Sequence, residues 1–211
     1  MTEGDHQGFL GAVYKAQGAD DLAGLYDSWA ATYDAEMARF GYRHPSIGLA
    51  LVARHVPRGA SPLLDAGAGT GLLGEWLSIA GYPHVEALDI SEGMLAIAAR
   101  KGCYAAFHTL ALGGPLPFAD GHFAGVAAVG VFSSGHVGAE GLDELIRICR
   151  PGGFLVLTVK NTLWEGGFAA RLGELVRLGW IEIVEETPPY VSMPGETGVI
   201  PSRAMALRVP G

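Results

Sequence analysis

The sequence predicts a doubly wound α/β fold built on a seven-stranded, mostly parallel β-sheet. From residue 61 onward, short apolar runs alternate with segments of helical period, which is typical of βαβ units. Five such runs occupy residues 62–66, 84–90, 104–110, 123–131 and 154–160. Two further extended stretches, 180–191 and 202–209, follow with no helix between them. They predict an antiparallel hairpin at one edge of the sheet.

Amphipathic helices between these runs are expected to cover both faces of the sheet. Leu73 and Leu77 share one face of the segment after the first run, and Leu142 and Leu145 share one face of the segment before the fifth. Residues 1–60 have helical pattern without a low-complexity linker. They predict an N-terminal helical cap packed on a core at residues 61–211.

Composition predicts one globular, cytoplasmic unit. Hydrophobic residues make up 49% and charged residues 17% of 211, enough apolar side chains for a single core. The formal net charge of -8 disfavours nucleic acid as a partner, because a polyanion would be repelled. The longest apolar run, 124–132, is about half of a membrane span, so we expect no membrane insertion. Residues 2–6 carry acids where a signal peptide has a basic start.

The two cysteines, Cys103 and Cys149, match no zinc or redox spacing. We expect reduced thiols and no metal site, while a disulfide between them stays open. The number of subunits is not predicted.

A glycine-rich turn follows the first predicted strand and precedes an amphipathic helix. Gly67, Gly69 and Gly71 stand at every second position, at the edge where an open parallel sheet binds its ligand. A dinucleotide fingerprint is spaced Gly-x-Gly-x-x-Gly and places pyrophosphate in positive potential. Asp65 would oppose a pyrophosphate here, so the turn favours a cationic or amine-bearing ligand. A plain strand-to-helix turn is the alternative.

A second acid, Asp89, ends the second predicted strand 18 residues after Gly71. A carboxylate at this place can accept hydrogen bonds from both hydroxyls of a ribose. Ile90 is placed to pack against a base, and Ser91 can cap the helix that carries Met94. The alternative is an acid that only favours the start of that helix.

Two further sets of side chains have both a functional and a structural interpretation. His136 follows the fourth strand at the ligand edge of the sheet, where it can act as a general base or make a structural hydrogen bond. Tyr26, Trp29 and Tyr33 repeat at helical spacing, which suits a cover over the ligand or a buried core. Both interpretations stay open for both sets.

These motifs resemble those of the class I S-adenosylmethionine-dependent methyltransferases, which have a Rossmann-like fold. Residues 63–71 resemble motif I of that family, and Asp-Ile-Ser-x-x-Met-Leu at 89–95 resembles the segment after it. Leu-Pro-Phe at 116–118 and Arg-Pro-Gly-Gly at 150–153 resemble turns of the small-molecule methyltransferases related to the ubiquinone and menaquinone enzymes. Tyr-Asp-x-Trp-Ala-x-x-Tyr-Asp at 26–34 resembles the helix that covers the donor. Together these segments resemble the methyltransferase-like family of the Williams–Beuren region.

The resemblance implies an enzyme that moves a methyl group from S-adenosylmethionine to an acceptor and releases S-adenosylhomocysteine. The residues expected to bind the donor are Tyr26, Trp29, Tyr33, Asp65, Gly67, Ala68, Gly69, Gly71, Asp89, Ile90, Met94, His108 and Thr109. We expect the acceptor to be a small organic molecule, with His136 as the base where the acceptor must lose a proton.

The adenine side departs from the pattern of the family. Many relatives carry an acid before Leu-Pro-Phe that binds the adenine amino group, where this chain has Leu-Ala-Leu-Gly-Gly at 110–114. Relatives also have Phe-Asp where this chain has Phe123 and Ala124. Adenine is therefore expected to be held by backbone groups or by His108 and Thr109.

Two other functions remain possible on the sequence. A nicotinamide-dependent oxidoreductase would also use a parallel sheet and an acid after the second strand. A non-catalytic regulatory protein would keep the donor site without turnover. The fourth strand does not end in Asn- or Asp-Pro-Pro-Tyr, which argues against methylation of amino groups on DNA bases or glutamine.

Overall fold

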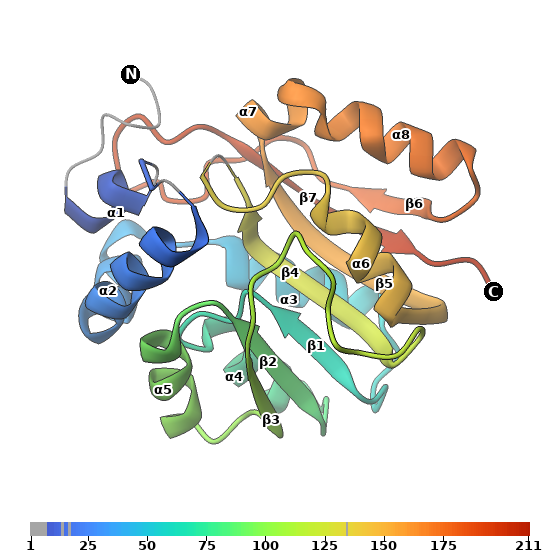
Figure 1. Ribbon diagram of the computed structural model, residues 1–211, viewed down its shortest axis with the longest axis horizontal. Helices are drawn as coiled ribbons and strands as arrows, with labels where there is room; N and C mark the ends of the chain where they lie inside the picture. The colour runs from blue at the N-terminus through green and yellow to red at the C-terminus, as the bar shows by residue number, and fades with distance from the viewer. Residues whose placement is uncertain (1–7, 14, 17, 134) are drawn as a thin grey trace.

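The predicted strands form one sheet in the computed structural model, which describes residues 8–13, 15–16, 18–133 and 135–211. The strand order is β3-β2-β1-β4-β5-β7-β6 (Figure 1). Strand β7 is antiparallel to both of its neighbours and the other pairs are parallel, which confirms the predicted fold class. The strands are β1 (Leu63–Ala66), β2 (Val85–Asp89), β3 (Ala106–Thr109), β4 (Phe123–Phe132), β5 (Cys149–Lys160), β6 (Glu182–Glu186) and β7 (Ser202–Arg208).

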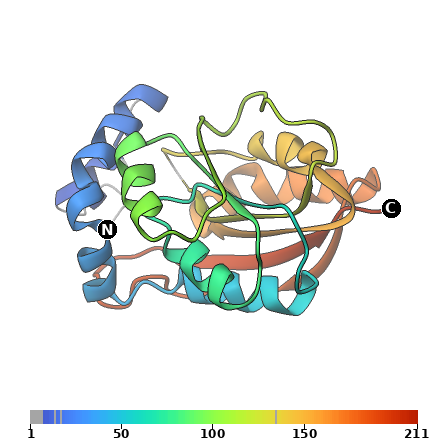
Figure 2. The same ribbon diagram turned by 90° about the horizontal axis from the view of Figure 1, so that it is seen from below.

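Helices cover both faces of the sheet, α3 and α4 on one face and α6 and α8 on the other (Figure 2). The long helix α2 packs against α5 at the end of the sheet where the parallel strands finish (Figure 1). The helices are α1 (Gly8–Val13), α2 (Ala19–Phe40), α3 (His44–His55), α4 (Leu72–Ile79), α5 (Glu92–Arg100), α6 (Gly141–Ile148), α7 (Asn161–Leu163), the π-helical turn η2 (Trp164–Phe168) and α8 (Ala169–Arg177).

The predicted N-terminal cap at residues 1–60 divides into two parts in space. Helix α2 lies against α5, whereas α3 packs on the sheet itself, against β4, β5 and β7. Residues 1–7, 14 and 17 of this segment lie outside the described part of the chain. Among the described residues, no helix is both long enough and apolar enough to cross a membrane.

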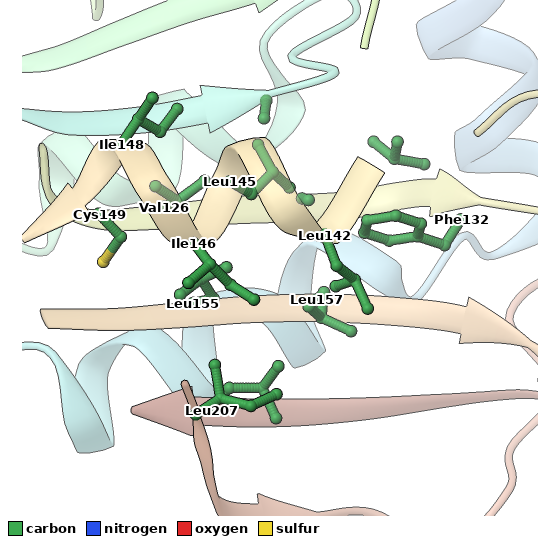
Figure 3. Close-up of a cluster of buried hydrophobic side chains, with 14 of the residues drawn as sticks. Val126, Phe132, Leu142, Leu145, Ile146, Ile148, Cys149, Leu155, Leu157 and Leu207 are labelled. Atoms are coloured by element: carbon green, nitrogen blue, oxygen red, sulfur yellow. The ribbon is translucent and has the colours of Figure 1, made fainter. Parts of the chain in front are cut away.

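The largest part of the core lies between α6 and the sheet (Figure 3). Leu142 and Leu145 point from α6 onto Val126 of β4 and Leu155 and Leu157 of β5 (Figure 3). Each of these side chains is at most 3% exposed. Burial of one such side chain stabilises the fold by about 1.5–3 kcal/mol, so the apolar period read from the sequence is the face that α6 buries.

Strand β5 begins earlier than predicted. Cys149 already pairs with Phe123, and the ladder resumes only at Gly125 with Phe154, so the residues between form a bulge. Proline and glycine inside a strand are typical of a bulge. The apolar period therefore identified only the part of β5 after Gly153. Both cysteines are free thiols.

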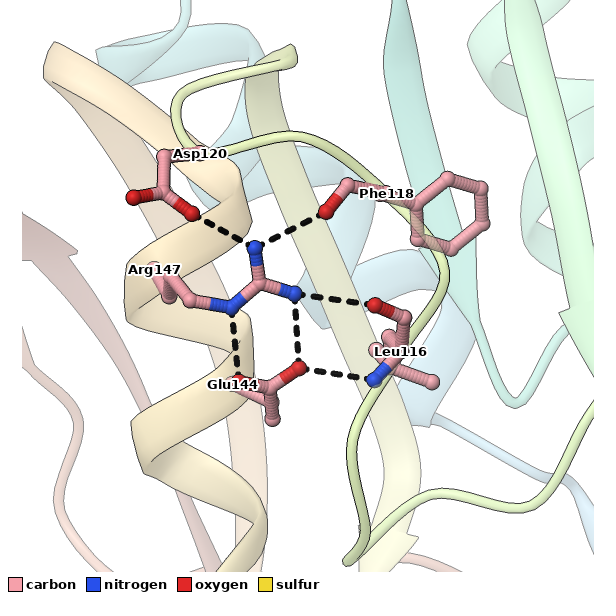
Figure 4. Close-up of polar contacts among 5 residues, drawn as sticks. All are labelled: Leu116, Phe118, Asp120, Glu144 and Arg147. Carbon is pink, nitrogen blue, oxygen red and sulfur yellow. Dashed lines mark hydrogen bonds and ion pairs between the residues drawn. The ribbon is translucent and has the colours of Figure 1, made fainter.

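The connection between β3 and β4 is held by one arginine of α6 (Figure 4). The Arg147 guanidinium donates to both oxygens of Glu144, each at 2.7 Å, and to the carbonyl oxygens of Leu116 at 2.9 Å and Phe118 at 2.8 Å. Asp120 accepts a further bond at 2.7 Å. Hydrogen bonds from Arg147 lower the pKa of Glu144 to about 2. The five donors of a planar guanidinium match this set of acceptors.

Replacement of Arg147 by lysine is expected to loosen this connection, because an ammonium cannot donate in the same fork. Backbone amides of residues 110–122 should exchange hydrogen several-fold faster than in the wild type, measured by mass spectrometry. Arg171→Lys is the matched control, because Arg171 also binds two acids, Asp143 and Glu174, but donates to no loop carbonyl among the residues that the structure describes. Equal exchange in the two variants would contradict the assignment.

Candidate functional site

A cavity of about 450 Å³ lies at the carboxyl ends of β1, β2 and β4 and is bordered by α2. This is the edge where an open α/β sheet binds its ligand. The sequence-predicted residues that line it are Tyr26, Tyr33, Asp65, Gly67, Ala68, Gly69, Asp89, Ile90, Met94 and His136. Four other predicted residues, Trp29, Gly71, His108 and Thr109, do not line it.

The glycine-rich turn depends on backbone conformations that side chains disfavour. Gly67, Gly69 and Gly71 have φ values of 81°, 54° and 84°. A Cβ on Gly67 would stand 2.3 Å from a methyl carbon of Val131, so β4 also requires a glycine there. The N–H groups of Gly67 and Ala68 both donate to the Leu88 carbonyl oxygen. The turn is thus bonded to β2 and presents a fixed wall to the cavity.

Asp65 is a buried acid at the end of β1, only 2% exposed. Its Oδ2 accepts a hydrogen bond of 2.6 Å from the Tyr104 hydroxyl. Burial raises the pKa of Asp65 from 3.8 to about 7, and the bond from Tyr104 opposes the shift only in part. Because this acid lines the cavity, a cation bound there would favour its ionised form.

Tyr104 was not predicted as a site residue, and it reaches Asp65 only because α4 carries a glycine. A Cβ on Gly74 would stand 2.2 Å from the Tyr104 hydroxyl oxygen. The sequence contains one signal of this contact, a glycine inside an amphipathic helix, which often has a packing reason.

Gly74→Ala is therefore expected to destabilise the protein although alanine is the better helix former by about 1 kcal/mol. The new methyl group would force Tyr104 away from Asp65. Thermal unfolding should show a lowered midpoint. Gly173→Ala in α8 is the control, because a Cβ there meets no described atom within 4 Å. That control should raise stability by about 0.5–1 kcal/mol, and a similar rise for Gly74→Ala would refute the packing argument.

Asp89 ends β2 and is bonded to two backbone segments. Its Oδ2 accepts from the Gly69 N–H at 2.7 Å, and its Oδ1 accepts from the Ser91 N–H at 3.0 Å. Burial raises the pKa of Asp89, and these backbone bonds lower it in part. A carboxylate has about four acceptor sites, so acceptor capacity remains for a ligand. Ser91 caps α5 by accepting from the Met94 N–H, as predicted.

Two acids of α2 tie this helix to the site. Asp27 accepts from the Ser91 hydroxyl at 2.6 Å and from the Gly93 N–H at 2.8 Å. Asp34 accepts from the Thr70 hydroxyl and forms an ion pair of 2.9 Å with Lys101. Both acids follow a tyrosine in the 26–34 segment, and sequence reasoning did not assign them a role. They attach α2 to the glycine-rich turn and to the start of α5.

The aromatic side chains of α2 serve both roles that the sequence suggested, because some border the cavity and one is buried in the core. Tyr26 and Tyr33 line the cavity. Trp29 is 1% exposed and stacks against Phe9 and Tyr26 in a separate apolar cluster. These side chains therefore form a cavity wall along one edge and a core along the other.

His136 is held at both of its ring nitrogens. Nε2 lies 2.7 Å from the Tyr26 hydroxyl, and Nδ1 lies 2.8 Å from the Ser133 hydroxyl. The pair Tyr26 and His136 joins α2 to the end of β4 across the cavity.

The adenine side of the predicted site differs from the expectation. His108 bonds to Glu86 at 2.7 Å and packs edge-on against Phe118, and Thr109 is exposed. The wall of the cavity beyond β3 is formed by the next residues, Leu110 to Leu112. We therefore leave His108 and Thr109 out of the site.

Several known proteins of one family are similar to this chain in sequence. The profile of a family described as methyltransferase domain matches residues 64–157. Human methyltransferase-like protein 27 is 33% identical over 180 residues, which are 81% of this chain and 73% of that protein. A demethylmenaquinone methyltransferase of Clavibacter sepedonicus is 30% identical over 144 residues, 67% of this chain and 58% of that protein.

A solved structure has the same fold at low sequence identity. It is the 1,6-didemethyltoxoflavin-N1-methyltransferase of Burkholderia thailandensis, with 1,6-didemethyltoxoflavin and S-adenosylhomocysteine bound. The TM-score is 0.62 at 18% identity, over 93% of this chain and 92% of that chain.

Proposed function

This chain belongs to the class I S-adenosylmethionine-dependent methyltransferases, and on that premise we propose that its cavity of about 450 Å³ places the donor beside a small organic acceptor. The observation that carries the proposal is the pair of buried acids, Asp65 and Asp89, which line one cavity beside the glycine-rich turn. A donor with a positive charge and a ribose satisfies both acids, whereas a pyrophosphate would be repelled.

Each end of the donor has a fitting partner in this cavity. Asp65 would hold the amino group of the methionine part, since its carboxylate is buried with one hydroxyl partner. Asp89 would accept the ribose hydroxyls at the sites that Gly69 and Ser91 leave unused. Apolar side chains of Ile90 and Leu112 line the cavity nearby and suit the faces of a base.

The remaining wall suits an organic acceptor. Tyr26, Tyr33, Tyr42 and Leu163 line it with aromatic and apolar side chains. The donor supplies a methyl group already activated on a sulfonium, so the protein's main contribution is to align the acceptor, which can supply several kcal/mol of the barrier. Two similar proteins are named for small organic molecules, demethylmenaquinone and 1,6-didemethyltoxoflavin, which supports this class of acceptor.

His136 is the group that would take a proton from the acceptor. It is the only histidine among the described residues that line this cavity. Ser133 fixes the ring through Nδ1, and Tyr26 contacts Nε2 at the cavity wall. A base oriented in this way typically contributes about 10²–10⁴-fold to the rate.

The proposal is tested by calorimetry and by transfer of radiolabelled methyl. S-adenosylhomocysteine should bind the purified protein, and NADH should not. With labelled S-adenosylmethionine and a cell extract, the label should appear in the small-molecule fraction. Binding of the nicotinamide cofactor alone would overturn the donor assignment. Label found only in protein or nucleic acid would overturn the class of acceptor.

A further inference from the structure

A second, smaller cavity of about 50 Å³ lies against the first, between α2 and the ends of β4 and β5. Tyr26, Tyr33, Tyr42, Ser133 and His136 line both cavities. The small cavity, which we call the inner chamber, therefore adjoins the part of the large cavity assigned to the acceptor. The functions described so far leave it unused.

The inner chamber is lined by buried hydrogen-bond donors that have no acceptor within the described part of the chain. Trp29 Nε1 and Ser192 Oγ are both buried without a hydrogen-bond partner among the described residues, on side chains that are 1% exposed. Thr158 Oγ1 accepts a hydrogen bond of 2.7 Å from the Gly130 N–H, so the proton of this hydroxyl is available to donate. A buried donor left unpaired costs about 1–3 kcal/mol, so a set of them around one small space indicates a ligand that accepts.

The charges around the inner chamber also favour a ligand that accepts hydrogen bonds. The described residues around it include Lys160, which is 5% exposed, and include no Asp or Glu. His44 also lines it and adds no charge at neutral pH. Burial lowers the pKa of His44 to about 3, with a further contribution from Lys160, and its Nδ1 lies 2.7 Å from the Tyr190 hydroxyl. The chamber thus combines donors with a positive charge.

We propose that the inner chamber binds a carboxylate of the acceptor, so that the substrates of this enzyme are small organic acids. Its volume of about 50 Å³ exceeds the ~30 Å³ share of one water molecule and suits a carboxylate but no ring. The rest of the acceptor would lie in the large cavity beside Tyr26 and His136. This inference rests on the proposed function, because it assumes that the large cavity is where the acceptor is methylated.

The test compares benzoate with benzamide, two probes of the same shape of which only benzoate is charged. Both are titrated by calorimetry into the full-length protein, with and without saturating S-adenosylhomocysteine. Benzoate should bind at least about tenfold more tightly, because two or more buried donors and a cation favour an anion. Equal binding of the two probes would overturn the proposal.

Conservative variants assign the effect to the inner chamber. Ser192→Ala removes one donor with little change in volume, and Trp29→Phe removes another together with part of the ring volume. Each should weaken benzoate binding by about tenfold relative to benzamide binding in the same variant. Lys160→Met should abolish the preference for benzoate. Trp180→Phe and Lys15→Met, at exposed positions, are the matched controls. Unchanged benzoate binding in the three chamber variants would place the probe elsewhere and refute the assignment.

The same titrations separate this inference from the proposed function. Failure of the wild type to bind S-adenosylhomocysteine would overturn the donor assignment. A preference for benzoate in the ligand-free protein that disappears in Ser192→Ala would still support the inner chamber as a carboxylate site.

Discussion

Asp65→Asn is expected to weaken the binding of S-adenosylhomocysteine by about a hundredfold at pH 8. The variant keeps the shape of the side chain but removes a buried negative charge, and a hydrogen bond to a charged group contributes about 1.5–3 kcal/mol. Calorimetry measures the loss. Glu75→Gln is the control, because Glu75 is an exposed acid on the neighbouring helix α4. A similar loss in both variants would mean that only the net charge matters.

The same acid predicts how donor binding depends on pH. Burial raises the pKa of Asp65 to about 7, so in the free protein the group takes up a proton as the pH falls through 7. A cationic ligand prefers the ionised form, so affinity should fall below pH 7 by up to about tenfold per pH unit and level off above it. Asp65→Asn should lose the part of this slope centred near pH 7. A wild-type affinity that is flat from pH 5.5 to 8.5 would contradict the assignment.

The stability of the ligand-free protein should depend on pH in the opposite direction from donor binding, because Asp65 is buried. A raised pKa means that the folded state binds more protons than the unfolded state between about pH 4 and pH 7. The contribution of Asp65 to stability is therefore present at low pH and is lost as the pH rises to 7. Denaturant unfolding should show Asp65→Asn gaining stability relative to the wild type over this range.

Gly67→Ala should be the most damaging single change in the glycine-rich turn. An alanine at a φ of 81° costs about 1–2 kcal/mol, and its Cβ would stand 2.3 Å from a methyl carbon of Val131. Overpacking of this kind typically adds about 1–3 kcal/mol. The free energy of unfolding should fall by the sum of these two costs, and binding of S-adenosylhomocysteine should be lost, because Val131 of β4 would displace the turn that lines the cavity.

Gly69→Ala provides the matched comparison for that prediction. Gly69 also has a positive φ, 54°, but a Cβ there would have no atom of the described residues within 4 Å. Its loss of stability should be limited to the backbone cost of about 1–2 kcal/mol. The double variant Gly67→Ala with Val131→Ala should recover part of the collision cost. If Gly69→Ala is as destabilising as Gly67→Ala, the packing of Val131 against the turn is not the cause.

Sequence periodicity predicted much of the fold because burial repeats along a strand or helix. The apolar runs that became β1, β2 and β4, and the face of α6 that carries Leu142 and Leu145, are local patterns that one covered surface produces. The bulge before Phe154 was not predicted, because Pro151 and Gly153 interrupt that pattern while the chain continues in the same strand.

The cavity wall beyond β3 shows where local patterns fail. His108 and Thr109 were expected at the adenine, but they are the last two residues of the edge strand β3. The His108 side chain bonds to Glu86, and the Thr109 side chain is exposed to solvent. The residues that line the cavity instead, Leu110 to Leu112, belong to a connection whose later part is held by Arg147, far along the chain. The course of that loop depends on a partner that no neighbouring residue indicates.

The sequence by itself determined the order of the strands along the chain, the glycine-rich turn and the two acids that end β1 and β2, because these are local in the chain and carry a known spacing. Only the tertiary structure decided what those acids touch and what surrounds them. The bond of Tyr104 to Asp65 across Gly74 and the donors of the inner chamber join segments distant in sequence. Long-range packing sets such contacts, and their chemistry is defined only when the chain has folded.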